Sequence, residues 1–220
     1  MRILICSYRD WANLESETFS EIESLWVDHL TDPSELVDQL SKKKYDLIFF
    51  IGWSWIVPRN IVENNYCICV HPSPLPKYRG GSPIQHQIIA GESNSAVTFF
   101  KMTEKVDAGP IILQYSFSLG GSLSDVFDRI SINTRLGLRK ILETYPNLAL
   151  LEQDDSVSTY YKRRTPDLSE ITLEELNNCS PEQLYNKIRC LQQPYPTAYI
   201  KCSNGGKLYL LDVRAESPSD

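Results

Sequence analysis

Residues Leu47–Ile51 read LIFFI, an apolar run without any polar residue to face solvent. A strand with one wet face alternates apolar and polar residues, so this continuous run predicts a strand buried on both faces. Just before it, Asp32–Glu35 has the form of a capping box with proline at the first helical position, and Leu36, Val37 and Leu40 supply an apolar face. A helix followed by a fully buried strand indicates an α/β fold.

Four more apolar runs continue this pattern along the chain. We expect strands over Ile3–Cys6, Cys67–Val70, Val97–Phe100 and Ile111–Phe117. Ser122, followed three residues later by Asp125, begins a long predicted helix whose apolar residues recur at helical spacing. The sequence therefore predicts the α/β class, with a mostly parallel central sheet.

The last part of the chain has a different character. Tyr160–Glu170 is polar and interrupted by proline, which predicts a linker. Beyond it, Ser180–Gln183 caps a helix, and a turn at Asn204–Gly206 precedes a predicted strand over Lys207–Val213. We therefore expect one domain over residues 1–160, and a linker with a short helix-plus-strand extension over residues 161–220.

The charge balance bears on the class of partner. The chain has 22 Lys and Arg against 28 Asp and Glu, for a formal net charge of −6 at pH 7. Binding to a phosphate backbone needs clustered basic residues, so we expect no nucleic-acid partner, although Lys162–Arg164 form one short basic run. No run approaches the ~18–20 apolar residues of a membrane span, and the N-terminus is too weakly apolar for a signal peptide. These observations predict a cytoplasmic protein without a membrane partner.

His71 is the first candidate for chemistry. It ends the apolar run Cys67–Val70, and Pro72 must stop the strand there because proline cannot donate to a sheet. Ligands of open parallel sheets bind outside the carboxyl ends of the strands, and Gly80–Gly81 allows a ligand to approach the backbone closely. The alternative is a histidine that caps the strand and bonds to a backbone carbonyl. Both interpretations stay open on these residues alone.

Cys67, Cys69 and His71 alternate, so on a strand they share one face. Alternate residues lie ~6.6 Å apart, whereas zinc ligands sit only ~2.0–2.3 Å from the metal. One ion cannot take all three without breaking the strand, so we predict no metal site. The six cysteines show no CxxC pairing and are expected to be reduced thiols.

A partner for His71 is available in the segment KMTEKVDAGPI, residues 101–111. A carboxylate beside an imidazole orients the ring and favours its charged form, which is the arrangement that Asp107 would provide. An aspartate shortly before glycine is, on its own, more often a turn former. The pairing therefore depends on the motif that surrounds it.

That motif is HPSPLPKYRGGSPIQHQIIAGESNSAVTFFKMTEKVDAGPIILQ, which resembles the signature of the folate-dependent formyltransferases. The family includes methionyl-tRNA formyltransferase, glycinamide ribonucleotide transformylase and the sugar-nucleotide N-formyltransferases. LIFFIGWSWIVPRNIV resembles its segment beside the pterin pocket. RRTPDLSEI, with the later LYNKIRCLQQPYPTAYI, resembles its segment after the catalytic domain. The resemblance implies a Rossmann-like formyltransferase fold with the catalytic domain over residues 1–160. It also implies N10-formyl-tetrahydrofolate as co-substrate.

The resemblance assigns roles residue by residue. His71 matches the catalytic histidine, Asp107 the aspartate that supports it, and Cys69 the position of an asparagine. The residues expected to bind the folate are Trp53, Ser54, Trp55, Ile56, Ser73, Pro74, Leu75, Pro76, Gly81, Thr103, Glu104, Lys105 and Val106. Those expected to bind the acceptor are Lys77, Tyr78, Arg79, Tyr8 and Arg9. Trp53 and Trp55 also fit a plain core role, the usual fate of an aromatic in an apolar run.

Cys69 is a departure from the family's Asn-x-His pattern. The asparagine amide helps to hold the formyl oxygen as it becomes an oxyanion, and a thiol is a much weaker donor. The enzyme therefore relies on His71 and a backbone amide, or is slow, or has become a catalytically weak folate-binding homologue. Cys69 as a nucleophile is a further alternative, for which His71 is the one nearby argument.

The acceptor is predicted from the same resemblance. The GWSW and HPSPLPKYRGGSPIQ phrases are most similar to the sugar N-formyltransferases, which often serve lipopolysaccharide O-antigen biosynthesis. This favours a 4-amino-4,6-dideoxyhexose linked to a nucleoside diphosphate. The methionyl-tRNA enzymes carry a further C-terminal domain, and about 50 residues after the linker are too few for one, which makes tRNA the alternative acceptor. A homodimer is expected, with Lys207–Val213 pairing either with a partner chain or within its own domain.

Overall fold

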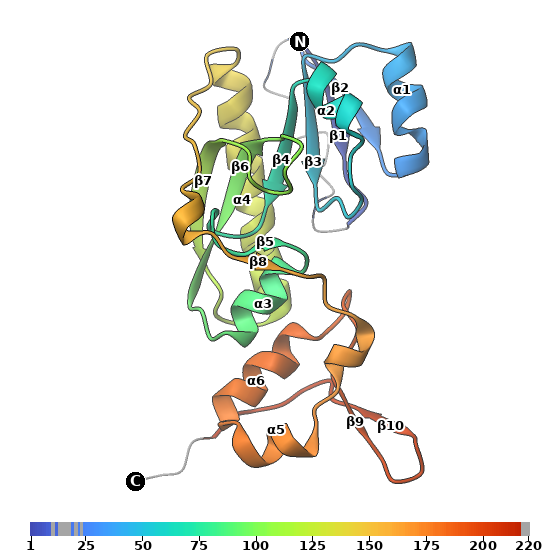
Figure 1. Cartoon of the computed structure of the whole chain (residues 1–220), viewed down its shortest axis with the longest axis vertical. Coiled ribbons are helices and arrows are strands. Elements are labelled where there is room, and N and C mark those ends of the chain that lie inside the picture. The colour runs from blue at the N-terminus through green and yellow to red at the C-terminus, as the bar shows by residue number, and fades with distance from the viewer. Residues whose placement is uncertain (10–11, 13–18, 20–21, 23, 217–220) are drawn as a thin grey trace.

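The computed structural model describes residues 1–9, 12, 19, 22 and 24–216, and its centre is a six-stranded sheet of order β2-β1-β3-β4-β6-β7 (Figure 1). The strands are β1 (Arg2–Cys6), β2 (Trp26–Leu30), β3 (Leu47–Ile51), β4 (Cys67–His71), β6 (Asn94–Lys101) and β7 (Ile111–Ser118). The first four run parallel, and β6 and β7 are antiparallel to their neighbours. The α/β class with a mostly parallel central sheet is confirmed.

All five apolar runs form strands, and β3 has the predicted bounds because every one of its residues is buried. β2 was not predicted from its sequence, WVDHL. It is an edge strand, and its Trp26 is 67% exposed, so it needs no continuous apolar character. An edge strand paired on one side only leaves little pattern in the sequence.

Helices cover both faces of the sheet. The long helix α4 (Leu123–Thr144) begins as predicted, with Ser122 and Asp125 in a reciprocal capping box, and packs on β6 and β7. α1 (Leu36–Lys42) and α2 (Arg59–Asn64) bring Leu36 and Ile61 to the opposite face. Alternate residues of β1 accordingly enter two separate cores. This burial on both sides explains why the strand sequences are apolar throughout.

The region before α1 differs from the sequence-based expectation in two details. Asp32 caps a short 3-10 turn, η3 (Pro33–Glu35), by accepting from Ser34 N at 2.8 Å, rather than forming a capping box with Glu35. Val37 is 62% exposed and does not belong to the apolar face, which Leu36 and the partly buried Leu40 provide.

The segment Tyr160–Glu170, expected to be a linker, contains a short strand and a 3-10 turn. Its residues form β8 (Tyr160–Tyr161), which pairs with β5 (Arg79–Gly80), and η5 (Pro166–Ser169); η4 (Asp155–Val157) precedes them. After it come α5 (Leu173–Asn178), α6 (Pro181–Cys190), β9 (Tyr199–Lys201) and β10 (Lys207–Tyr209). α6 packs on α3 (Pro83–Ile89), below the sheet in Figure 1.

The predicted strand Lys207–Val213 is shorter than expected and ends at Tyr209. It pairs antiparallel with β9 of the same chain, so its hydrogen bonds are made internally. Within the described part of the chain, no helix combines the length and apolar character that crossing a bilayer requires.

Candidate active site

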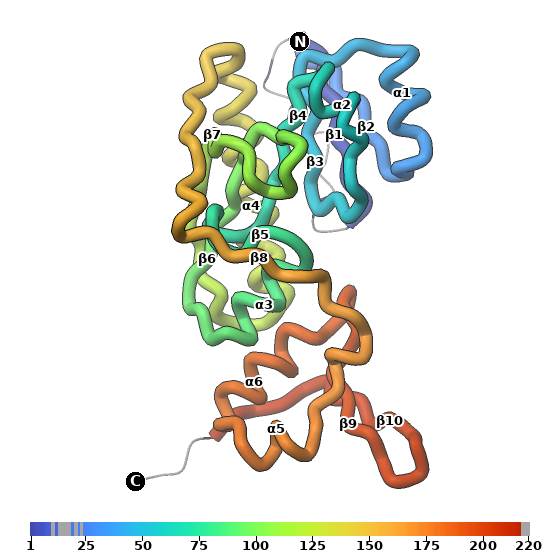
Figure 2. Tube along the Cα trace, in the orientation of Figure 1, coloured from blue at the N-terminus to red at the C-terminus, as the bar shows by residue number. Residues whose placement is uncertain are grey.

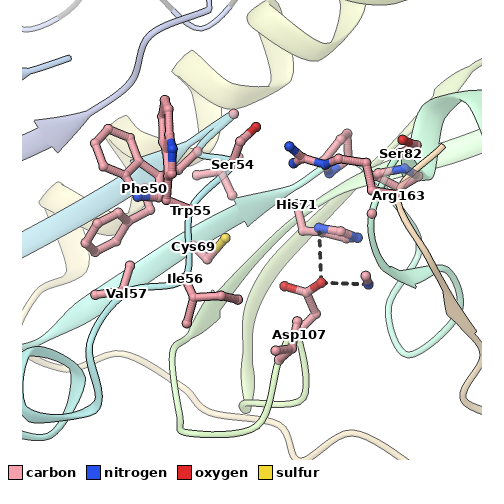
Figure 3. Close-up of a pocket in the computed structure, with 18 of the residues that line it drawn as sticks. Phe50, Ser54, Trp55, Ile56, Val57, Cys69, His71, Ser82, Asp107 and Arg163 are labelled. Atoms are coloured by element: carbon pink, nitrogen blue, oxygen red, sulfur yellow. Dashed lines mark hydrogen bonds and ion pairs between the residues drawn. The ribbon is translucent and has the colours of Figure 1, made fainter. Parts of the chain in front are cut away.

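A cavity of about 880 Å³ opens beyond the carboxyl ends of β3 and β4, the position that the sheet topology favours for a ligand. His71 is the last residue of β4, and the loop between β6 and β7 supplies Asp107. Figure 3 shows the two side chains facing one another, with Cys69 beside them. All three line the cavity, so the structure brings together the three residues expected to be catalytic.

His71 is held by a different protein oxygen near each ring nitrogen. Its Nε2 lies 2.9 Å from the carbonyl oxygen of Tyr78, and its Nδ1 lies 3.7 Å from Oδ2 of Asp107. The carbonyl can only accept, so Nε2 carries a proton and donates it. Nδ1 then has the lone pair in the neutral ring, and in the charged ring a second proton aimed toward the carboxylate and the cavity. The backbone hydrogen bond expected of a structural histidine therefore exists. It engages Nε2 and orients the ring, and it leaves Nδ1 available to a ligand in the cavity.

Asp107 is fixed by the backbone on the opposite side. Its Oδ2 accepts from Gly80 N at 2.8 Å, so the same oxygen faces both Gly80 and His71. Asp107 itself has φ 51°, a left-handed conformation that costs about 1–2 kcal/mol in a residue with a side chain. The turn-forming role and the pairing with His71 are thus combined in one residue.

Cys69 lies two residues before His71 on the same face of β4. Burial, followed by the charge of Asp107, raises the pKa of its thiol well above the usual value. The sulfur is therefore protonated at neutral pH, which disfavours the nucleophile alternative because the thiolate is the reactive form. Among the described residues, no group of three or more His, Cys, Asp or Glu is placed to hold a metal ion.

One wall of the cavity is apolar and aromatic. Its residues are Phe50, Trp53, Trp55, Ile56, Val57, Val62, Phe100 and Met102. The rings of Trp53 and Trp55 lie 5.0 Å apart, and Tyr8 packs on Trp55 at 4.6 Å and bonds to the Ser54 hydroxyl. Trp55 is 43% exposed and Ile56 81% exposed, although both line the cavity. Large apolar side chains left open beside a cavity are suited to cover the faces of a ring system.

The opposite wall is formed by Gly80–Gln85 and by residues of the C-terminal part, including Arg163, Arg164 and Tyr195. Gly81 lets these segments meet, since a Cβ there would lie 2.5 Å from backbone atoms of Arg163. Arg164 donates to the carbonyl of Leu168, and its Nε has no hydrogen-bond partner among the described residues. Burial lowers the pKa of this guanidinium.

The expected binding residues divide into two groups. Trp53–Ile56, Gly81, Thr103–Val106 and Arg9 line the cavity. The contacts expected of Ser73, Pro74, Leu75, Pro76, Lys77, Tyr78 and Arg79 with folate or acceptor stay predictions, although Ser73–Arg79 do not line the cavity. The reason is that their polar groups serve the loop: Ser73 Oγ, for example, donates to Lys77 O at 2.9 Å. Tyr8 is absent from the lining. It packs on the ring of Trp55 and bonds to the hydroxyl of Ser54, two residues of the cavity wall.

Several lining residues were not predicted. Arg163 and Arg164 belong to the short basic run noted in the sequence, which was the available signal for them. Pro194–Pro196 and Gln85 lie in segments that resemble the family, but no pattern in those segments indicated a contact with the cavity, which depends on the docking of α6 on α3. A contact that depends on how two distant helices pack cannot be found from local pattern.

Residues 11–123, just over half of the chain, match the family model described as formyl transferase. Methionyl-tRNA formyltransferase of Halalkalibacterium halodurans is 32% identical over 188 residues, which cover 81% of this chain and 56% of the relative. The chain therefore spans just over half the length of such curated relatives.

Solved structures of this kind have the same fold. Methionyl-tRNA formyltransferase from Clostridium thermocellum aligns with a TM-score of 0.82 and 27% identity, covering 98% of this chain and 100% of that one. A 4-N formyltransferase from Francisella tularensis aligns with a TM-score of 0.78 and 19% identity, covering 99% and 98% of the two chains. At this level of identity, the second likeness concerns the fold alone.

Proposed function

Because the chain belongs to the folate-dependent formyltransferase family, we propose that it moves the formyl group of N10-formyl-tetrahydrofolate to an amine. The observation that carries this proposal is the His71–Asp107 pair at the end of β4, inside the cavity. A histidine with one nitrogen bonded to a carbonyl and the other near a carboxylate is prepared to stabilise negative charge and to move a proton.

The cavity suits the folate co-substrate in size and character. A volume of about 880 Å³ falls within the range of small-molecule sites, and one wall consists of exposed aromatic and aliphatic side chains. Trp53, Trp55 and Ile56 would cover the pterin ring, while Thr103–Val106 border the cavity beside Asp107. Bound in this way, the folate would turn its N10 end toward His71.

The proposed reaction needs no covalent intermediate with the protein. A neutral amine attacks the formyl carbon, and the carbonyl oxygen becomes an oxyanion. His71, protonated at Nδ1 and supported by the Asp107 carboxylate 3.7 Å away, donates to that oxygen. Collapse breaks the bond from carbon to N10, the amine loses one proton, and N10 gains one through His71 or water. The products are the formamide and tetrahydrofolate.

For the acceptor we propose a nucleoside-diphosphate-linked amino sugar, of the 4-amino-4,6-dideoxyhexose type. Arg163 lines the cavity, and Figure 3 shows it on the side of His71 away from Asp107. No hydrogen bond or ion pair engages its guanidinium within the part of the chain that the structure describes. A free guanidinium beside a reaction centre matches the bidentate recognition of phosphate.

Two alternatives have their own support. Curated relatives such as the Halalkalibacterium halodurans protein are methionyl-tRNA formyltransferases, which favours an aminoacyl-tRNA acceptor, whose phosphates Arg163 would also suit. Against it stands the net charge of −6. The replacement of asparagine by Cys69 favours a catalytically weak, folate-binding homologue, whereas the retained geometry of His71 and Asp107 favours turnover.

The test is a transfer assay with N10-formyl-tetrahydrofolate and a panel of acceptors: GDP-, dTDP- and UDP-linked amino sugars, and methionyl-tRNA. Mass spectrometry detects the formylated acceptor. We expect product from an amino sugar, and an acceptor KM raised about 10- to 100-fold in Arg163→Glu, the loss expected for a charge-assisted hydrogen bond.

The matched control is Lys162→Glu, which makes the same charge change next in the chain at an exposed residue outside the lining. It should leave the KM for the acceptor and the KM for N10-formyl-tetrahydrofolate unchanged. Formylation of methionyl-tRNA alone would overturn the sugar acceptor. Folate binding without product from any acceptor would favour the binding-protein alternative.

A further inference from the structure

A single segment connects the loop that carries Asp107 with the segment Tyr78–Gly80, whose backbone contacts both members of the catalytic pair. We call residues 151–161 the strap, and Figure 2 traces it across the front of β5 after α4. At its start, Leu151 and Ile111 exchange backbone hydrogen bonds of 2.8 and 2.9 Å, directly after the loop of Asp107. At its end, β8 pairs with β5, with Arg79 opposite Tyr160. Both ends of the strap are therefore fixed by backbone contacts.

Gln153, in the middle of the strap, makes side-chain hydrogen bonds to both of these segments. Its Nε2 donates to the carbonyl oxygens of Asp107 and Gly109, at 3.0 and 2.7 Å. Its Oε1 accepts from Nε and Nη2 of Arg79, at 3.1 and 2.8 Å. One amide thus uses its donors on the Asp107 loop and its acceptor on the Arg79 loop.

The residues on either side of Arg79 are those that hold the catalytic pair. Tyr78 O receives the hydrogen bond of His71 Nε2, and Gly80 N donates to Asp107 Oδ2. Tyr78 and Asp107 both have left-handed backbones, with φ of 60° and 51°, which side-chain residues adopt only when contacts hold them. A displacement of Arg79 would therefore change both hydrogen bonds of the pair.

Arg79 itself depends on the strap. It is 8% exposed, and its remaining nitrogen, Nη1, pairs with the exposed Asp155 at 2.8 Å. A buried guanidinium must have partners, since an unpaired buried charge is strongly destabilising. Gln153 provides two of its three contacts. The arginine and the glutamine are thus a coupled unit.

We propose that Gln153 is a positioning residue for formyl transfer, which sets the distance and angle between His71 and Asp107 through Arg79 and the Asp107 backbone. It does not line the cavity, so it touches neither the folate nor the acceptor. The inference rests on the proposed function, because it concerns the same reaction. It adds a residue from outside the cavity to the machinery of that reaction.

The decisive variant is Gln153→Glu. It keeps an oxygen for Arg79 and replaces the amide donor by a carboxylate that faces the Asp107 and Gly109 carbonyls. We expect kcat to fall about 10²-fold, the cost of a small misplacement at a reacting centre, with an unchanged KM for N10-formyl-tetrahydrofolate. We also expect the ring nitrogen signals of His71 to move in ¹⁵N spectra of the free protein, while those of His29 stay.

Gln192→Glu is the matched control, because the half-buried Gln192 also donates its amide to two backbone carbonyls, of Ile188 and Leu210 at 3.2 and 3.0 Å. It should leave kcat and the His71 signals unchanged. Circular dichroism and folate binding, followed by tryptophan fluorescence, show that each variant is folded.

Wild-type kcat and unmoved His71 signals in Gln153→Glu would overturn the inference while leaving the proposed function intact. A wild-type protein that formylates no acceptor would instead overturn the proposed function. In that case the His71 signals alone decide whether Gln153 positions the ring.

Discussion

Cys69 lies where the family carries an asparagine amide, and its side chain enters the cavity beside His71 (Figure 3). The raised pKa of this half-buried thiol keeps it protonated, as a weak hydrogen-bond donor. We therefore expect Cys69→Asn to raise kcat, by as much as ~10²-fold, because one oxyanion donor is typically worth ~10²–10³ in rate. Steady-state kinetics at saturating folate measure this change.

Two further variants make that prediction specific. Cys67→Ala changes a buried thiol on the same strand that does not line the cavity, and should leave kcat as it is. Cys69→Ala should retain turnover, since no bond to sulfur is needed. Loss of all activity in Cys69→Ala would instead identify the sulfur as a nucleophile.

Individual residues differ in how far the sequence could reveal them. His71 and Asp107 were found because they stand in a motif, and the structure places them 3.7 Å apart as a pair. Gln153 is polar, lies in an irregular segment and follows no pattern. Its four hydrogen bonds reach residues 44 to 74 positions away in sequence, so only the folded chain shows them.

Among the elements, α5 and α6 are connected by an ion pair, and we expect their docking to depend on pH. Lys187 of α6 donates to the carboxylate of Glu175 in α5 and to the carbonyl oxygen of Glu170. The side chain of Lys187 is 12% exposed and that of Glu175 is 29% exposed. Burial acts to raise the pKa of Glu175, but donation by Lys187 and by the Thr172 backbone outweighs it, and the net direction is downward. The pair is therefore stabilising while Glu175 is charged.

We expect Lys187→Met to lower the free energy of unfolding by about 2 kcal/mol at pH 7, the loss typical of a hydrogen bond to a charged group. The lowered pKa means that this contribution is complete above the unfolded value of about 4.3 and is lost as the pH falls through the folded value. Urea unfolding at pH 7 and near pH 3 measures the difference between wild type and variant.

The control is Lys201→Met, which removes the pair between Glu170 and a lysine whose side chain is 59% exposed, and should cost much less than loss of the more deeply buried Lys187. An equal cost of Lys187→Met at both pH values would contradict the role given to Glu175.

The elements that the sequence predicted well are those in which one structural feature, such as burial on both faces or a helix cap, determines which residues can occur. β3 is buried on both faces and α4 has a complete capping box, so their residues allow little else. α2, α3 and α5 were missed, because each has only six or seven residues and offers too few turns for helical periodicity. β5 and β8 have two residues each and exist only through their pairing with one another.

At the scale of the whole molecule, the C-terminal part completes the cavity that the sheet begins. Figure 1 shows α5, α6, β9 and β10 beyond one end of the sheet, yet Arg163 and Tyr195 from this part line the same cavity as His71. A division at residue 160 falls inside β8, whose two residues pair with β5. We therefore propose that residues 161–220 act as one wall of the site and not as a separate appendage.

The most direct test of the account follows the formyl carbon itself. N10-[¹³C]formyl-tetrahydrofolate is given to wild type and to His71→Ala with the acceptor that the panel identifies, and the label in the acceptor is measured by mass spectrometry. Folate binding is measured in parallel by tryptophan fluorescence. We predict labelled acceptor from wild type, and from His71→Ala equal folate binding with transfer slowed at least ~10²-fold. Equal transfer by the two proteins would contradict the account, because the chemistry would then lie outside the His71–Asp107 pair.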